Sequence, residues 1–189
     1  MIGYAICGSF CSFTKTLAVL ERLVAEGYEI QPIMSERAYL TDTRFWSAKE
    51  FRERIEALTG REIIRTVEDA EPLGPKTPLD ALIISPCTGN TLAKIARGIT
   101  DSAVTMAAKA HLRSDRPLLI ALASNDAMSQ NLSNIARLLT RRSLYFVPMR
   151  QDDPSGKPHS LVAEFNMLPE ALVAMRDGRQ LRPIFLEPK

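Results

Sequence analysis

The run IISPCTGNTLAKIARGITD, from Ile83 to Asp101, decides the fold. An apolar segment stops at Pro86, the polar cluster Cys87–Thr91 follows at once, and a stretch with helical periodicity runs from Leu92 to Gly98. This order predicts a strand, a polar turn and a helix. Ligands of parallel α/β sheets bind at such a point, and the positive end of the following helix suits an anionic group. Small hydroxyl and amide side chains also let a flat ring come close.

The same alternation of short apolar segments and helical stripes extends over the whole chain. We expect strands at residues 2–7, 28–34, 81–85, 118–123 and 144–147, each followed by a polar or proline-containing turn. We expect one helix that ends at Gly27, and a second that is capped by Ser47 and ends at Gly60. Further helices are expected over Ser102–Leu112, through Met128–Leu139 and over Leu168–Arg176. The pattern predicts an α/β fold: three α/β/α layers, a mostly parallel sheet, flavodoxin- or Rossmann-like.

Domain organisation follows from the same pattern. The 189 residues suit a single domain, residues 1–189, with a loop and a C-terminal helix extension at about 150–189. Two segments rich in proline and glycine, Asp69–Pro78 and Gln151–Ser160, are expected to be loops.

Composition excludes several classes of protein. Hydrophobic residues make up 46% of the chain and the net charge is +2, which argues against disorder and against a nucleic-acid-binding surface. No apolar stretch is long enough to span a membrane, and MIGYAICGSF reads as a first strand and not as a signal peptide. The three cysteines have no metal-ligand spacing, so we expect no metal site and a reducing, cytoplasmic location.

Four expected strand ends carry short polar clusters, which are Gly8–Ser12, Ser35, Pro86–Thr91 and Ser124–Asp126. In a parallel sheet these ends lie on one edge, so the clusters can converge on one ligand. The loop Gly8–Ser12 can hold a phosphate with N–H groups and hydroxyls. It lacks the GxGxxG pattern, which argues against a dinucleotide site in this chain.

At this point the residues resemble a known family. PCTGNTLAKIARGITD resembles the PxxxNTxAKxAxGxxD signature of the homo-oligomeric flavin-containing cysteine decarboxylases, and the resemblance covers roughly Met1 to Val147. Asn125 to Met128 resemble the NxxM half of that family's PxMNxxM motif, but Leu122-Ala123-Ser124 stand where Pro-x-Met is expected.

The resemblance implies an FMN site and a homo-oligomer, a trimer or a dodecamer, with the flavin near subunit contacts. The residues that would bind the cofactor are Gly8, Ser9, Phe10, Ser35, Pro86, Thr88, Gly89, Asn90 and Thr91. Asn125 and Met128 would face the substrate. The family's catalytic His is missing, because the region before the strand expected at residues 81–85 reads EPLGPKTPLD, so we do not expect cysteine decarboxylation.

The strings YAICGSF, IMSERAY, DAEPLGPK and YFVPMRQDDP look like one branch of this superfamily, which contributes one chain of a two-chain dehydrogenase in spore-forming bacteria. That similarity implies oxidation of a dihydropyridine dicarboxylate, or its hydrated precursor, during sporulation, with NADP on the partner chain. Two alternatives stay open: an independent FMN-dependent oxidoreductase or decarboxylase, and a non-catalytic scaffold protein that has lost the flavin. No catalytic residue is assigned, and His159 is the one weak candidate for a general acid–base group.

Several of these side chains also have a purely structural interpretation. Asn90 could cap the next helix, Cys87 could be a packing residue, and Trp46 could belong to the core instead of a flap over the ligand. We expect Lys94, Arg97 and His111 to lie on solvated helix faces. The same is expected of the basic cluster formed by Lys109, His111, Arg113 and Arg116, although that cluster could also attract a dicarboxylate or face a partner.

Overall fold

The computed structural model describes residues 1–74 and 76–188. Its five parallel strands are β1 (Ile2–Ile6), β2 (Ile30–Met34), β3 (Ala81–Cys87), β4 (Leu118–Ser124) and β5 (Leu144–Phe146). They lie in the order β2-β1-β3-β4-β5, and every pairing between them is parallel. This is the strand order of flavodoxin-like folds, in which the chain reverses its direction of winding between β1 and β3.

Two short strands extend the sheet beyond this parallel part. They are β6 (Met149–Arg150) and β7 (Leu161–Ala163). The first half of β4 pairs with β5, while its last residues, Ala123 and Ser124, pair antiparallel with β7. One edge of β4 is therefore shared by two strands, and the hairpin β6–β7 lies beside the carboxyl end of β4. The predicted α/β fold with a mostly parallel sheet is confirmed.

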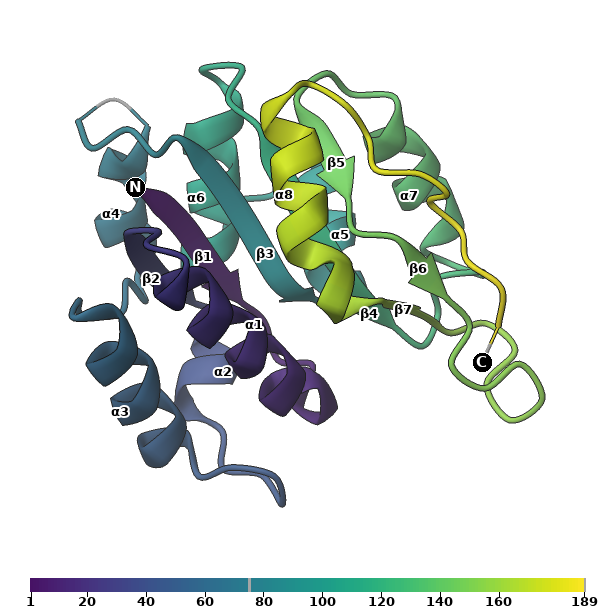
Figure 1. Ribbon diagram of the computed structural model, residues 1–189, viewed down its shortest axis with the longest axis horizontal. Coiled ribbons are helices and arrows are strands. Elements are labelled where there is room, and N and C mark those ends of the chain that lie inside the picture. The colour runs from purple at the N-terminus through teal and green to yellow at the C-terminus, as the bar shows by residue number, and fades with distance from the viewer. Residues whose placement is uncertain (75, 189) are drawn as a thin grey trace.

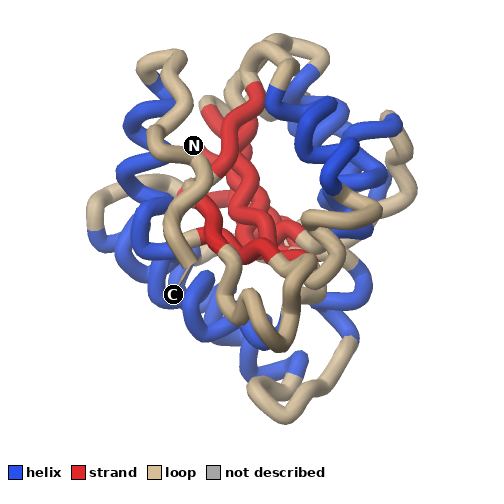
Figure 2. Tube along the Cα trace, turned by 90° about the vertical axis from the view of Figure 1, so that its right-hand side faces the viewer, coloured by secondary structure: helices blue, strands red, loops and turns tan. Residues whose placement is uncertain are grey.

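Helices cover both faces of the sheet (Figures 1 and 2). The longer ones are α1 (Phe13–Ala25), α3 (Ala48–Thr59), α5 (Gly89–Arg97), α6 (Ala103–Leu112), α7 (Leu132–Leu139) and α8 (Leu168–Arg176). The shorter ones are η1 (Phe10–Ser12), α2 (Glu36–Leu40), α4 (Val67–Ala70), η2 (Glu71–Leu73) and η3 (Phe165–Met167). The chain thus has the expected three layers.

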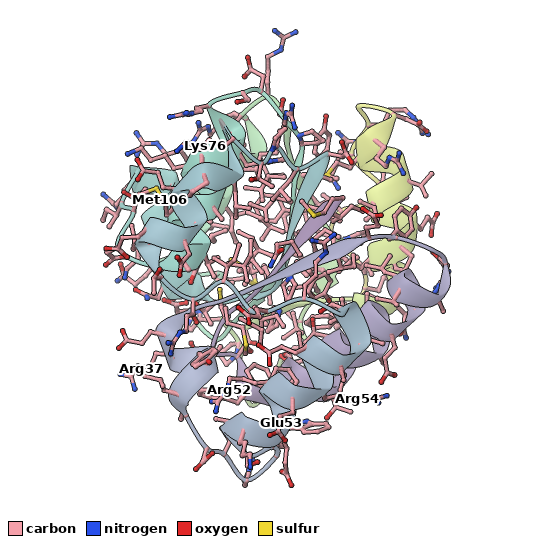
Figure 3. The ribbon with its side chains drawn as sticks, turned by 90° about the vertical axis from the view of Figure 1, so that its left-hand side faces the viewer. Arg37, Arg52, Glu53, Arg54, Lys76 and Met106 are labelled. Atoms are coloured by element: carbon pink, nitrogen blue, oxygen red, sulfur yellow. The ribbon has the colours of Figure 1, made fainter. Side chains whose placement is uncertain are left out.

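Side-chain alternation along the strands builds two separate cores. Tyr4 and Ile83 point to the face packed by α1, α3 and α8, whereas Ala5 and Ile84 point to the face packed by α5, α6 and α7. Because both faces are covered, the strands are apolar along their whole length, as expected for a buried parallel sheet. The outer faces of the helices carry charge: Figure 3 shows Arg37 on α2, and Glu53 and Arg54 on α3.

Strand β3 does not stop at Pro86 as predicted. It continues to Cys87, and all seven of its residues are buried. The Ser85–Pro86 peptide bond is cis, and the carbonyl of Pro86 still accepts the N–H of Cys7 from β1 at 3.1 Å. The proline therefore ends the regular register with β4 without ending the strand.

Three further predictions need correction. The second strand begins at Ile30 and not at Tyr28. The expected loop Asp69–Pro78 contains the end of α4 and the turn η2, because Thr66 caps α4 by accepting the N–H of Asp69 at 3.1 Å; Pro75 lies outside the described residues.

The helix expected from Met128 starts only at Leu132. Before it, residues 125–130 form turns in which the carbonyl of Asp126 accepts the N–H groups of Ser129 and Asn131, each at 3.1 Å. The turn-forming Asp126 thus delays the helix by four residues relative to the pattern of apolar positions.

A buried series of hydroxyl groups joins β1 and α1 to β3. The hydroxyl of Tyr4 lies 2.7 Å from Oγ1 of Thr16, and Thr16 in turn donates to the carbonyl of Ser85 at 2.7 Å. Oγ of Ser85 lies 2.8 Å from the same Thr16 oxygen. Burial raises the pKa of Tyr4 to about 12, so its hydroxyl stays protonated. These hydrogen bonds between hydroxyl groups fix α1 against the cis peptide bond before Pro86.

The substitution Thr16→Val tests this series of hydroxyl groups. Valine keeps the shape of the side chain but leaves Ser85 and the hydroxyl of Tyr4 short of a buried partner, so the free energy of unfolding should fall by about 1–3 kcal/mol. Urea denaturation measures the change, with the exposed Thr77→Val as control. Equal stability of the two variants would contradict a structural role for the series.

Candidate functional site

The carboxyl ends of four neighbouring strands form one continuous edge. The N–H of Ser35, after β2, donates to the carbonyl of Ile6 at 3.0 Å, which joins the ends of β2 and β1. The bond from Cys7 to Pro86 joins β1 to β3 at the point where the winding reverses. The expected convergence of Gly8–Ser12, Ser35 and Pro86–Thr91 is therefore present in the backbone.

The ends of β3 and β4 meet at Gly89. A Cβ atom on Gly89 would lie 2.4 Å from Oγ of Ser124, 2.6 Å from Nδ2 of Asn131 and 2.7 Å from Oδ1 of Asp126. Asn131 donates to both carboxylate oxygens of Asp126 at 2.9 Å, and Ser124 donates to Oδ1. Only glycine lets the start of α5 lie against this polar network.

Helix α5 is capped by Thr88 and not by Asn90. Oγ1 of Thr88 accepts the N–H of Thr91 at 3.3 Å, while the side chain of Asn90 is exposed and has no hydrogen bond within the described structure. The structural interpretation of Asn90 as a cap is therefore wrong. Its amide is available to a ligand, whereas Gly89 and Thr91 are buried and shape the edge from beneath.

The start of α5 suits an anion less well than the sequence pattern alone suggests. Its first turn is already capped by Thr88, and the carboxylate of Asp126 lies against Gly89. Hydrogen bonds from Ser124 lower the pKa of Asp126, so this carboxyl group is charged at neutral pH. A negative charge already occupies the positive end of the helix, and a second anion there would be repelled.

The start of α1 is different. Neither Ser9, before η1, nor Ser12, before α1, makes a side-chain cap, and the first turn of each helix contains no acidic residue. The hydroxyls of Ser9 and Ser12 lie 3.4 Å apart. Five other helices, α2 to α6, have serine or threonine caps. The N–H groups of Ser9 and Ser12 already have backbone partners. The paired hydroxyls, and a helix start without a side-chain cap or an acidic residue, therefore make the loop after β1 better suited to an anion.

Phe10 and Trp46 belong to one aromatic cluster on the α1 side of this loop. The ring of Phe10 packs edge-on against Phe13 at 5.3 Å, Phe13 stacks on Phe51 at 4.2 Å, and Trp46 lies 5.5 Å from Phe51. The indole N–H of Trp46 donates to Thr14 at 3.3 Å. These contacts support the core interpretation of Trp46.

The two buried cysteines at the edge, Cys7 and Cys87, are unsuited to act as nucleophiles. Burial raises the pKa of Cys7 to about 11, and burial followed by the neighbouring Cys7 raises the pKa of Cys87 well above its ordinary value. Both thiols stay protonated at neutral pH, and the thiolate is the reactive form. Cys87 is the packing residue that its position suggests.

The segment Gln151–Ser160 is a loop, as expected, and it lies at the end of β4. The N–H of Met128 donates to the carbonyl of His159 at 2.9 Å. Lys157 pairs with Asp152 at 3.0 Å, and this contact raises the pKa of Lys157, with a smaller contribution from the charge of Asp153. Asn125, Met128 and His159 are all exposed at this end of the edge.

Two other expectations are settled by burial and pairing. His111 is fully buried and not on a solvated face; its Nε2 lies 2.8 Å from the carbonyl of Pro117, and burial lowers its pKa. Lys94 of α5 pairs with Asp101 at 2.7 Å, and this ion pair fixes the turn between α5 and α6.

Sequence reasoning missed the role of Asp126, although the residue stands beside Asn125. Its only sequence signal is the pair of nearby asparagines, Asn131 and Asn134, whose side chains continue the network: Asn134 donates to Asn131 at 2.9 Å. Within residues 1–74 and 76–188 there is no group of His, Cys, Asp and Glu side chains arranged to hold a metal ion. No helix of this part of the chain could cross a bilayer.

Comparisons with known proteins agree with this geometry. Residues 1–166 match the model of a family described as Flavoprotein. The B subunit of dipicolinate synthase from Bacillus subtilis (strain 168) is 42% identical over 186 residues, which cover 98% of this chain and 93% of that protein. The crystal structure of the dipicolinate synthase B subunit from Bacillus halodurans C has a TM-score of 0.91 and 40% identity, covering 100% of this chain and 96% of the other.

A second solved structure is more distant. The FMN-dependent cysteine decarboxylase SpaF has a TM-score of 0.66 and 25% identity, and the match covers 92% of this chain and 95% of the other. The arrangement of strands and helices is thus shared with FMN-dependent enzymes over nearly the whole chain.

The substitution Gly89→Ala tests the close approach of β3 and β4. The added methyl group would displace three hydrogen-bonded side chains, so the free energy of unfolding should fall by roughly 1–3 kcal/mol. Thermal or urea denaturation measures this. The neighbouring Asn90→Ala is the matched control, with an expected change within about 0.5 kcal/mol because the side chain is exposed. If Gly89→Ala left the free energy of unfolding unchanged, the close contact of Gly89 with the three side chains would be refuted.

The charge of Asp126 predicts a pH dependence. A carboxylate whose pKa is lowered by folding stabilises the protein above its unfolded pKa of about 3.9, and this contribution is lost as the pH falls through the folded pKa. Asp126→Asn should therefore be less stable than the natural chain at pH 7, with the difference shrinking below about pH 4. Denaturation curves between these values test it, with exposed Asp115→Asn as control. A constant difference across the range would contradict the assignment.

Proposed function

The chain belongs to the Flavoprotein family, and from that premise we propose that it is the B subunit of a dipicolinate synthase. It would take part in the oxidation of dihydrodipicolinate, or its hydrated precursor, to dipicolinate during sporulation. The observation that carries the proposal is the 42% identity to the Bacillus subtilis protein over 98% of this chain. The fold agrees throughout, with a TM-score of 0.91 to the Bacillus halodurans protein.

The residues at the strand edge fit FMN. The loop after β1 offers the hydroxyls of Ser9 and Ser12, which are donors that a phosphate needs, and a helix start without a side-chain cap or an acidic residue. The exposed amide of Asn90 offers both a donor and an acceptor, as the polar edge of an isoalloxazine ring requires. Bound FMN would supply the capacity to accept and return electrons.

In this proposal each part of the edge has one task. Gly8, Ser9 and Phe10 bind the phosphate, and Ser35 contacts the phosphate or the ribityl chain. Pro86, Thr88, Gly89, Asn90 and Thr91 form the wall along the ring. Asn125 and Met128, exposed at the end of β4, face the substrate, and the neighbouring loop Gln151–Ser160 restricts the access of water. His159 is the candidate for moving a proton.

We also propose the partners of this chain. The A subunit of dipicolinate synthase would bind NADP, because the first loop of this chain reads GSFCS and lacks GxGxxG. The chain would also form a homo-oligomer, a trimer or a dodecamer. Large apolar side chains that remain exposed support contacts between its copies: Leu40, Phe45 and Leu132.

The alternative of a cysteine decarboxylase is not favoured. The segment EPLGPKTPLD before β3 has no His, and the two His residues of the sequence are the buried His111 and the exposed His159 of the late loop. The proton transfer that the family assigns to a His before that strand therefore has no matching side chain here.

An absorbance spectrum of the purified chain, with and without added FMN, tests the flavin site. We expect a flavin band that survives gel filtration, and a dissociation constant for FMN that rises at least about tenfold in Asn90→Ala, the equivalent of 1.4 kcal/mol. The matched control is Asn131→Ala, which removes a buried amide of the network beneath the edge and should lower stability more than it lowers FMN affinity.

The activity test uses both proteins of the synthase together. Production of dipicolinate by the NADP-binding partner should require this chain, and Asn125→Ala should reduce the rate with little change in stability because the side chain is exposed. Full activity of the partner without this chain would exclude a catalytic role. A colourless protein that cannot be loaded with FMN, yet is still required, would favour the scaffold alternative.

A further inference from the structure

A second concave site lies away from the strand edge, between the ends of α5 and α6 and the turn after α7. It has a volume of about 230 Å³. Its apolar lining comes from Ile95, Ala108, Leu112 and Ile99, the last of which is 46% exposed. Three cations stand at its rim: Lys109, Arg113 and Arg141. We call this the basic groove.

The cations of the basic groove lack counter-charges. Lys109 and Arg113 lie one turn apart at the end of α6, and Arg141 follows α7. None of the three side chains has an ion pair or hydrogen bond within residues 1–74 and 76–188, and no acidic residue lines the groove. Lys94, by contrast, is already neutralised by Asp101 at 2.7 Å.

Helix stability alone does not account for this arrangement. A cation in the last turn of a helix is favourable by itself, which explains the sign of the charge at Lys109. It does not explain why cations from two helix ends surround an apolar hollow, or why Ile99 is exposed at its rim. Exposed apolar surface bordered by polar groups marks binding sites.

The size of the groove limits what can bind there. A cavity of about 150 Å³ holds benzene, so about 230 Å³ accepts one ring with one or two small substituents and is below the usual size of a cofactor site. The apolar floor suits the face of the ring, and two guanidinium groups with one ammonium group suit carboxylates.

We propose that the basic groove binds a small aromatic carboxylate, a flat ring carrying one or two carboxylate groups. Dipicolinate belongs to this class, so the product of the reaction is one candidate ligand; that identification rests on the proposed function, whereas the groove itself does not. The site is separate from the strand edge, since none of its lining residues belongs to the loops after β1, β2, β3 or β4.

A matched series of compounds tests the chemistry. Isothermal titration of the full chain would use pyridine-2,6-dicarboxylate, benzene-1,3-dicarboxylate and benzoate as ligands, with acetate and benzamide as controls that lack the ring or the charge. We expect the three aromatic carboxylates to bind, with an affinity that falls at high salt, and we expect neither control to bind. Failure of both dicarboxylates to bind would overturn the proposal.

A matched pair of variants tests the location. Arg141→Gln should weaken dicarboxylate binding roughly five- to tenfold, while Arg142→Gln, next in the chain but outside the groove, should leave it unchanged. Ile99→Asp adds a negative charge at an exposed position and should abolish binding without unfolding the chain. Equal effects of Arg141→Gln and Arg142→Gln would overturn the assignment to this groove.

The outcomes also separate this proposal from others. Dicarboxylate binding that persists in Ile99→Asp but disappears in Asn90→Ala would place the ligand at the strand edge and refute the groove. If the ligands do not bind but Ile99→Asp changes the mass of the homo-oligomer or prevents binding of the NADP-binding partner, the groove is a protein interface instead. A chain that has no flavin and no activity but binds dicarboxylates at the groove would refute only the proposed function.

Discussion

The contact of Gly89 with Ser124, Asp126 and Asn131 is the constraint on which the rest of the site depends. It brings the start of α5 against the turn after β4, and even the methyl group of alanine would displace the side chains that lie there. Because the Asp126 carboxylate is held there by three donated hydrogen bonds, a negative charge already lies beside the start of α5. An anionic ligand group must then bind elsewhere on the edge, and the uncapped start of α1 is one strand away.

This constraint gives the edge two unlike halves. The half around β1 and β2 has free donors and an uncapped helix, and it suits a phosphate. The half around β3 and β4 has exposed amides over a buried polar network, and it suits a polar ring and a substrate. The buried hydroxyls of Tyr4, Thr16 and Ser85 connect the halves from below, since they hold α1 against the residues that precede Pro86. The direction in which FMN would lie along the edge, with its phosphate near β1 and its ring near β3, therefore follows from the packing beneath the site.

The sequence predicted what depends on local patterns and missed what depends on contacts between distant segments. Apolar runs and glycines marked the strands and the helix ends, and Gly60 and Gly98 do end their helices with positive φ values. The continuation of β3 through Pro86 could not be read from the sequence, because it depends on a hydrogen bond from Cys7. Likewise, Asn90 and Thr88 are equally good caps by composition, and only the fold decides between them. The burial of His111 and the role of Asp126 come from tertiary packing in the same way.

The central claim is that the phosphate of FMN binds at the loop after β1 and not at the start of α5. The most direct measurement compares the affinities for FMN and riboflavin, which differ only in the phosphate, in the two matched variants Ser9→Asp and Thr88→Asp. Each variant adds one carboxylate at the start of a helix. The account predicts that Ser9→Asp removes the preference for FMN over riboflavin, whereas Thr88→Asp preserves it. Loss of that preference in Thr88→Asp alone would contradict the account.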